Sequence, residues 1–111
     1  MQKAERPKKL TSITERMLTG CGNMYVTVAE HEGKPFEVFA TLGKAGGCPA
    51  CYAEATTRCI SLGLRSGVPI SEFINQLKNI ACPNSAIEDS KKILSCPDAI
   101  AKAMENSYRT D

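Results

Sequence analysis

The sequence has no tryptophan and only six other aromatic residues, three Tyr and three Phe, among its 111 residues. A core must therefore be built mainly from aliphatic side chains. Histidine occurs once, as His31, inside a stretch with turn composition and with no visible Cys, Ser or Asp constellation around it. We therefore do not expect histidine-based catalysis, and no paired carboxylates at a useful spacing suggest acid–base chemistry.

Long apolar runs are also absent. No stretch reaches the roughly 18 residues that a membrane-spanning helix needs, and the N-terminus lacks the apolar segment of a signal peptide. We expect a cytoplasmic protein without a membrane partner. The net charge of +2 is too small to favour nucleic acid as a partner, although Lys3, Arg6, Lys8 and Lys9 cluster at the start. This cluster is predicted to be a solvated lead, with a binding arm as the alternative.

The length of 111 residues predicts one domain. We divide the chain into a flexible basic lead over 1–9, a single domain over 10–107 and a tail over 108–111. Alternating apolar residues predict strands, weakly over 10–18 and clearly over 23–30 and 35–42. The stretch His31-Glu32-Gly33-Lys34 lies between the last two strands and predicts a hairpin turn, with Gly33 free to take a positive φ.

Helical spacing replaces the alternation after residue 51. The expected apolar stripe of the first helix comprises Tyr52, Ala55, Cys59 and Leu62, with Ile60 beside it. Gly67 and Pro69 predict its end. A second helix follows from Ile70, Phe73, Ile74 and Leu77, and a third from Ala99, Ile100, Ala103 and Met104.

Residues 82–94 are predicted to form a loop with a helical turn around 87–92. Strands followed by helices indicate an α+β fold. We expect a small antiparallel sheet of about three strands, followed by about three helices packed on one of its faces.

Six cysteines are many for so small a chain: Cys21, Cys48, Cys51, Cys59, Cys82 and Cys96. Thiols stay reduced in the cytosol, so metal ligands or redox thiols are favoured over a disulfide framework. Cys59 lies on the expected apolar stripe and is predicted to be a small buried side chain.

Cys48 and Cys51 form a C-x-x-C pair, CPAC, which suits two ligands of one zinc ion or a redox pair at a helix start. Cys82 and Cys96 are separated by thirteen residues, which is compatible with the second half of a zinc site but is not specific to one. Because Pro97 suits a first helical position, Cys96 is predicted at the N-cap. The helix dipole would favour a thiolate there, unless Cys96 only replaces a capping serine.

The stretch GKAGG over residues 43–47 suggests a phosphate-binding loop but lacks the spacing of that motif. The alternative is a flexible segment that lets the backbone pass close to a neighbour. Five stretches in this order carry a resemblance to a known family: RPKKL, TGCGNMYVTV, PFEVFATLGKAGGC, SLGLRSGV and SCPDAIAKAM.

Together these stretches resemble the TSCPD domain, the C-terminal domain of adenosylcobalamin-dependent (class II) ribonucleotide reductases. The name is matched here by Ser95-Cys96-Pro97-Asp98, with Leu94 in place of the threonine. The resemblance spans about residues 6–104. It implies a role associated with deoxyribonucleotide synthesis, and a catalytic chain of such a reductase as partner.

The resemblance also implies which cysteines matter, since the family pattern has cysteines at the positions of Cys21, Cys48, Cys82 and Cys96. Four thiolates would suit a closed structural zinc site. Adenosylcobalamin would enter only through a separate catalytic chain, because the catalytic barrel is absent and the chain is not expected to be active alone. The alternative is a dithiol carrier in which Cys48 and Cys51 pass electrons from a thioredoxin-like reductant to a reductase active site.

Overall fold

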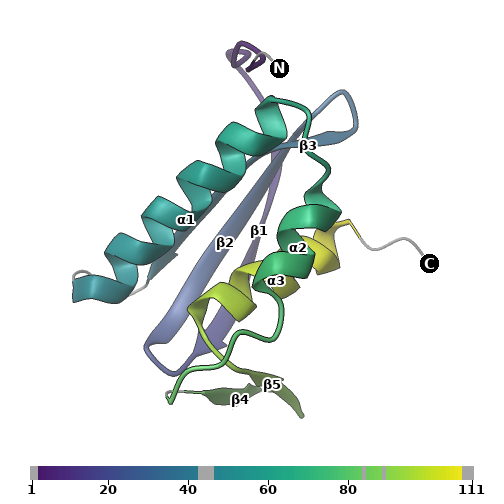
Figure 1. The fold of residues 1–111 in the computed structure, drawn as a ribbon. Coiled ribbons are helices and arrows are strands. Elements are labelled where there is room, and N and C mark those ends of the chain that lie inside the picture. The colour runs from purple at the N-terminus through teal and green to yellow at the C-terminus, as the bar shows by residue number, and fades with distance from the viewer. Residues whose placement is uncertain (1–2, 43–46, 84, 89, 109–111) are drawn as a thin grey trace.

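The computed structural model describes residues 3–42, 47–83, 85–88 and 90–108. The elements in chain order are β1 (Thr11–Thr19), β2 (Gly22–His31), β3 (Lys34–Leu42), α1 (Gly47–Arg65), α2 (Ile70–Leu77), β4 (Ala86–Glu88), β5 (Lys91–Ile93) and α3 (Cys96–Ser107) (Figure 1). The first three strands form one antiparallel sheet in the order β1-β2-β3. The predicted α+β fold is confirmed.

Both connections in the main sheet are tight. Thr19 pairs with Gly22 at the end of β1, which leaves Gly20 and Cys21 as a two-residue turn. At the other end of β2, Glu32 and Gly33 have φ values of 54° and 76°, as a two-residue hairpin turn requires. The hairpin predicted from Glu32 and Gly33 is therefore confirmed.

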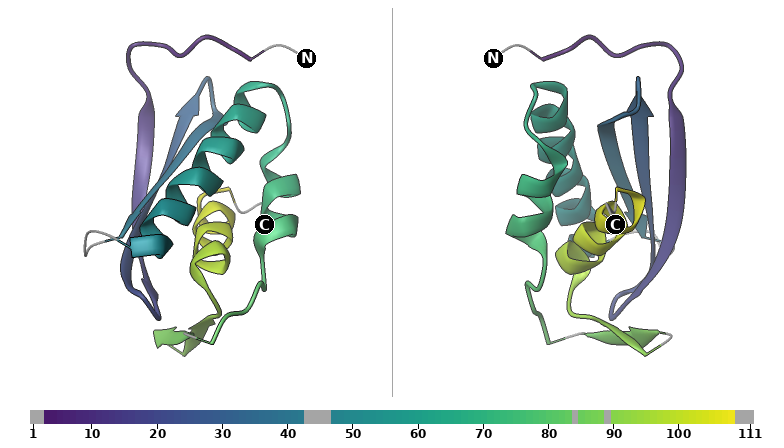
Figure 2. Two further views of the ribbon diagram at one scale, coloured as in Figure 1. Left: turned by 60° about the vertical axis from the view of Figure 1, so that its left-hand side comes forward. Right: turned by 90° about the vertical axis from the view of Figure 1, so that its right-hand side faces the viewer.

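The helices cover one face of the sheet, as Figure 2 shows. α1 packs along β3, α3 packs on β1 and β2, and α2 packs on α3. The inner face of the sheet is aliphatic, as the scarcity of aromatics predicts. Its buried residues are Met17, Met24, Val26, Val28, Val38 and Ala40, which meet Ile60 and Leu64 of α1 and Ile100 and Met104 of α3.

The predicted apolar stripe of α1 is wrong in phase. Its buried positions are Ala53, Thr57, Ile60 and Leu64, whereas the four expected stripe residues are exposed; only Ile60, expected beside the stripe, is buried. Tyr52 and Leu62 are 71% and 54% exposed, and Cys59 is exposed rather than buried. Small Ala53 and Thr57 allow close packing, and the Thr57 hydroxyl is satisfied by donating to the Ala53 carbonyl at 3.0 Å.

The helical turn expected around residues 87–92 is also wrong. A short hairpin occupies that segment, with Ala86 opposite Ile93 and Glu88 opposite Lys91. Ser90, in its turn, has a φ of 65°, a conformation that a helical turn does not contain. Arg16 of β1 reaches this hairpin through an ion pair with Glu88 at 2.7 Å.

The N-terminal lead contacts the body of the protein where it is described. The Ala4 amide donates to the Arg65 carbonyl at 2.8 Å, and Arg6 forms an ion pair with Glu37 at 2.6 Å. Residues 43–46 of the GKAGG stretch lie outside the described residues. Among the helices described, none is both long and apolar enough to cross a bilayer.

Candidate functional site

A cavity of about 320 Å³ lies where four segments that are distant in sequence meet. Its walls come from the β1–β2 turn, the first turns of α1, the loop after α2 and the start of α3. The lining residues are Cys21, Cys48, Pro49, Tyr52, Ala53, Thr56, Cys82, Ser95, Cys96, Pro97 and Ile100. All four cysteines singled out by the family resemblance therefore line one space, which we call the cysteine cavity.

Thr19 shapes the turn that carries Cys21. Its hydroxyl donates to the Gly22 carbonyl at 2.7 Å and accepts the Cys21 amide at 3.2 Å. Thr19 is only 3% exposed, so this turn is held from inside the fold. The same hydroxyl lies 4.0 Å from the Cys96 sulfur, which links the turn to α3.

Ser95, and not Cys96, caps α3. Its hydroxyl oxygen accepts the Asp98 amide at 3.1 Å and donates to the Ile80 carbonyl at 2.5 Å. The helix itself begins at Cys96, so the predicted N-cap is wrong by one residue. A serine oxygen is a better acceptor for the free amides of a helix start than a thiol, which leaves the Cys96 side chain available to line the cavity.

Asp98 is the buried centre of the Ser95-Cys96-Pro97-Asp98 motif, with no exposed surface. Its carboxylate accepts hydrogen bonds from the Asn79 amide at 2.7 Å, the Leu94 amide at 2.9 Å and Lys102 Nζ at 2.7 Å. Burial by itself would raise the pKa of Asp98, but the hydrogen bonds from Lys102 and the two amides outweigh it and lower that pKa. The carboxylate thus ties both ends of the 79–94 segment to α3.

The Cys96 thiol is favoured over its thiolate in this conformation. Burial is the largest cause of its raised pKa, and interactions with Cys21 and Cys82 raise it further, while the hydrogen bond to Thr19 lowers it. The direction of this pKa shift is opposite to the one that the helix dipole would favour. The influence of Cys21 and Cys82 on Cys96 also shows that these three side chains are close neighbours.

Cys48 and Cys51 lie in the first turn of α1, and both are exposed. Cys48 lines the cysteine cavity, whereas Cys51 is not among its lining residues. All six cysteines are thiols rather than disulfides in the structure. Cys59, two turns further along α1, is exposed and does not line the cysteine cavity.

The donor set suits zinc, but the described side chains do not form a closed site. In the ranges that the structure covers, no group of three or more His, Cys, Asp or Glu residues could hold a metal ion as placed. Four thiolates are a standard ligand set of structural zinc. The cysteine cavity thus collects suitable donors, and holding zinc would require their side chains to rearrange.

Two residues that organise the cysteine cavity were not found by sequence reasoning. Thr19 stands two residues before Cys21, a position from which a hydroxyl commonly bonds to a nearby turn amide. Asp98 is identified in the sequence only as the last residue of the Ser95-Cys96-Pro97-Asp98 motif. An acid directly after a Ser-x-Pro helix start was the available signal, but its amide partners could not be identified without the fold.

Comparison with known proteins supports the motif-based resemblance. The model of the TSCPD domain family matches residues 2–108, nearly the whole chain. No solved structure matches the chain. The match includes all four segments that surround the cysteine cavity, and the chain therefore belongs to the TSCPD domain family.

Proposed function

We propose that this protein is a zinc-stabilised interaction module that works with the catalytic chain of a class II ribonucleotide reductase. The TSCPD domain is known from ribonucleotide reductases, which associates the chain with that enzyme. The observation that carries the proposal is the convergence of Cys21, Cys48, Cys82 and Cys96 on one cavity. A cytoplasmic location belongs to the proposal, because ligand thiols must stay reduced.

Zinc would be held by those four cysteines and would act as a structural cross-link. It would join the β1–β2 turn, the start of α1, the loop after α2 and the start of α3. Such an ion supplies folding energy rather than catalysis, because four protein ligands leave no open position.

The surface beside the cysteine cavity supports a role in binding a partner. Tyr52, which lines the cysteine cavity, is 71% exposed. Tyrosine supplies a large contact area at a low entropy cost and is enriched at protein interfaces. The apolar stripe recognised in the sequence is thus available to a partner chain instead of forming the core.

The test is the zinc content of protein purified without chelator, measured together with thiol accessibility. We expect about one zinc per chain and four protected thiols, with Cys51 and Cys59 remaining reactive. Cys96→Ser should lose most of the metal, while the matched control Cys59→Ser should keep it. A metal content below about half an equivalent, with all six thiols reactive, would refute the zinc site.

A dithiol carrier is the second candidate, and it is favoured by the exposure of both Cys48 and Cys51 in the first turn of α1. In such a carrier the two thiols become a disulfide, and the two electrons and two protons they lose reduce a disulfide in the reductase. A thioredoxin-like reductant would then restore the dithiol. Unchanged reductase turnover with Cys51→Ser would exclude this candidate, whereas the zinc site does not depend on Cys51.

A further inference from the structure

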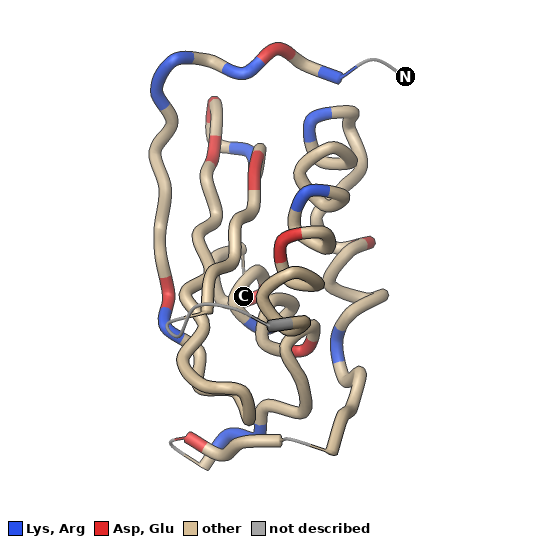
Figure 3. Tube along the Cα trace, turned by 90° about the vertical axis from the view of Figure 1, so that its left-hand side faces the viewer, with Lys and Arg blue, Asp and Glu red and all other residues tan. Residues whose placement is uncertain are grey.

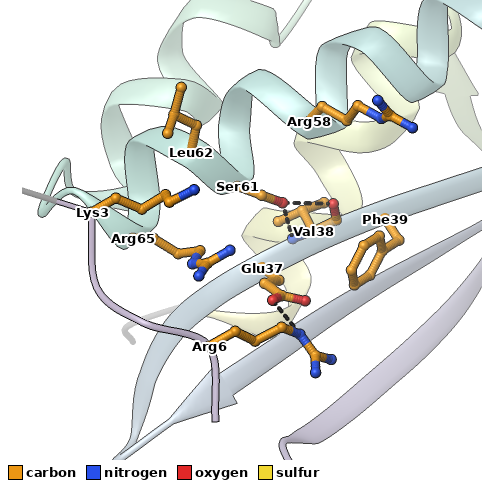
Figure 4. Close-up of a pocket in the computed structure, with 9 residues that line it drawn as sticks. All are labelled: Lys3, Arg6, Glu37, Val38, Phe39, Arg58, Ser61, Leu62 and Arg65. Carbon is orange, nitrogen blue, oxygen red and sulfur yellow. Dashed lines mark hydrogen bonds and ion pairs between the residues drawn. The ribbon is translucent and has the colours of Figure 1, made fainter. Parts of the chain in front are cut away.

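A second cavity, of about 380 Å³, lies between the N-terminal lead, β3 and the last turns of α1 (Figure 4). It is lined by Lys3, Arg6, Glu37, Val38, Phe39, Arg58, Ser61, Leu62 and Arg65. We call it the basic cavity. None of its lining residues lines the cysteine cavity, so the two sites are separate.

Positive charge dominates the basic cavity. Its lining has four cationic side chains and a single acid, Glu37. Figure 3 shows that the basic residues of the lead and those of the second half of α1 lie toward the same end of the molecule. Arg58 also forms an ion pair with Glu54 at 2.6 Å, but both side chains are well exposed, so that pair is weak and can yield to a stronger anion.

Glu37 is unusual in this cavity because it is the one acidic residue among the described lining residues. Its side chain is 4% exposed, and Oε1 accepts the Arg6 Nε–H at 2.6 Å. Oε2 is buried and has no hydrogen-bond partner among the described residues. A buried carboxylate oxygen without a donor is costly, so this atom favours a ligand that brings an N–H or O–H group. The Arg6 side chain is 49% exposed, so its pair with Glu37 lies at the border between the cavity and solvent.

The walls of the basic cavity are held in place by the fold. The Ser61 hydroxyl accepts the Val38 amide and donates to the Val38 carbonyl, each at 3.0 Å, which fastens α1 to the edge of β3. Arg65 donates two hydrogen bonds to the Ala4 carbonyl, at 3.1 and 2.9 Å, and fastens the lead to α1. A cavity built on such anchors is largely pre-formed, as ligand sites usually are.

The rim of the basic cavity adds apolar surface. Phe39 is 49% exposed and Leu62 is 54% exposed. Figure 4 places Phe39 and Arg58 toward one end of the cavity, while Lys3, Arg6 and Arg65 gather around Glu37. An exposed aromatic ring beside cations is suited to a flat or apolar group that carries an anion.

We propose that the basic cavity binds a small organic phosphate that has a flat or apolar group and a hydroxyl or amino donor. Lys3 and Arg65 hold the phosphate, because lysine and arginine are the residues that best match phosphate oxygens, and Arg58 adds positive charge at the end of the cavity where Phe39 lies. Glu37 Oε2 accepts the donor, and Phe39 packs against the flat group. This site goes beyond the proposed zinc-stabilised module and does not depend on it.

The test is titration of the full chain with AMP, which has all three features, followed by amide chemical shifts in NMR spectra at low ionic strength. We expect saturable shifts centred on Val38, Ser61 and Leu62. AMP should bind more tightly than inorganic phosphate and adenosine, and added salt should weaken it. Shifts that do not saturate, shifts centred elsewhere, or equal binding of inorganic phosphate and AMP would each overturn the proposal.

Variants sharpen this test. Arg58→Gln removes an exposed cation without a core contact and should weaken AMP binding about three- to tenfold. Lys91→Gln is the matched control, since it removes one exposed charge on β5, outside the basic cavity, and should leave AMP binding unchanged. An equal loss in both variants would mean that net charge alone attracts the ligand and would overturn the site.

Glu37→Gln tests whether the buried Oε2 atom of Glu37 accepts a hydrogen bond from the ligand. It places a donor where the ligand's donor should bind, so AMP binding should weaken while that of inorganic phosphate does not. The zinc content of the same sample, measured separately, distinguishes a failure of this site from a failure of the zinc proposal. If Glu37→Gln does not fold, Lys3→Gln, which alters an exposed lead residue, provides the same comparison with Lys91→Gln.

Discussion

The cysteine cavity and the basic cavity lie at opposite ends of α1 and are built in different ways. The cysteine cavity is formed by turns and helix starts, and its fixed points are the buried side chains of Thr19 and Asp98. The basic cavity is formed by the N-terminal lead, one strand edge and one helix, and its fixed points are Ser61 and Arg65. The first depends on groups buried inside the fold, whereas the second depends on exposed cations arranged around one buried acid.

This difference predicts that the two regions respond differently to the same kinds of change. Loss of a buried link should destabilise the whole fold, because buried partners are left unsatisfied. Loss of an exposed cation should affect ligand binding with little effect on folding, because surface charges contribute little to stability. Four expected outcomes follow, in order of decreasing effect.

Chelation of zinc-loaded protein should have the largest effect. We expect the free energy of unfolding to fall by about 5 kcal/mol or more, since a structural zinc contributes its binding energy to folding. Urea unfolding with and without chelator measures this loss. Cys96→Ser should show no chelator effect, and an equal chelator effect on both proteins would contradict zinc binding at the cysteine cavity.

Asp98→Ala should destabilise the protein by about 3 kcal/mol, because it leaves two amides and the partly buried Lys102 without their acceptor. Urea unfolding is again the measurement. Glu105→Ala is the matched control, since it removes a carboxylate from a pair with Lys78 in which both side chains are more than a third exposed. The control should lose less than about 1 kcal/mol, and an equal loss would contradict the assigned role of Asp98.

Ser61→Ala should lower the free energy of unfolding by about 1–2 kcal/mol. Val38 is 0% exposed, and its amide and carbonyl would lose their hydrogen-bond partner. The loss should also loosen α1 against β3, which amide hydrogen exchange at Val38 would report. Ser71→Ala, on an exposed position of α2, is the control and should leave this exchange unchanged. Unaltered exchange at Val38 in Ser61→Ala would contradict the role of Ser61 in holding α1 against β3.

Tyr108 should give the smallest effect, at the end of α3 away from Cys96. Burial, together with the charge of Glu30 and a 3.4 Å hydrogen bond to it, raises the pKa of Tyr108 to about 12 from its usual 10.0. The folded protein therefore favours the neutral phenol, and stability should fall as the pH rises from about 10 to about 12. Phenolate absorbance against pH should lose its last step in Tyr108→Phe, and an unchanged titration curve would contradict the shift.

β2, β3 and the second and third helices could be predicted because their patterns were clear, whereas the pattern of β1 was weak and β4 and β5 were expected as a loop with a helical turn. Alternation over β2 and β3 allows only one buried face, and Glu32-Gly33 supplies the turn between them. The phase of α1 could not be predicted, because two stripes with helical spacing exist on it. The stripe with the larger apolar residues, Tyr52 and Leu62, is the exposed one, since only small Ala53 and Thr57 allow a close approach to the sheet.

The candidate site was predictable in its residues but not in its construction. Cys21, Cys48, Cys82 and Cys96 were selected from a family resemblance, and the structure brings them to one cavity. The amides that Asp98 accepts belong to Asn79 and Leu94, which follow no local pattern that a sequence can reveal. The basic cavity combines Lys3 and Arg6 with Arg58 and Arg65, which are more than fifty residues away along the chain.

The sequence by itself determined the fold class, the hairpin of the sheet and the apolar faces of α2 and α3, because periodicity and turn composition act over a few neighbouring residues. It also carried the motifs of its family. Only the tertiary structure decided which face of α1 is buried, that Cys96 is favoured as a thiol, and that lead and helix enclose a basic cavity. Those outcomes depend on how segments that are distant in the sequence pack against one another. That packing sets which side chains touch and how strongly each ionisable group is shielded from water, and local sequence patterns do not reveal it.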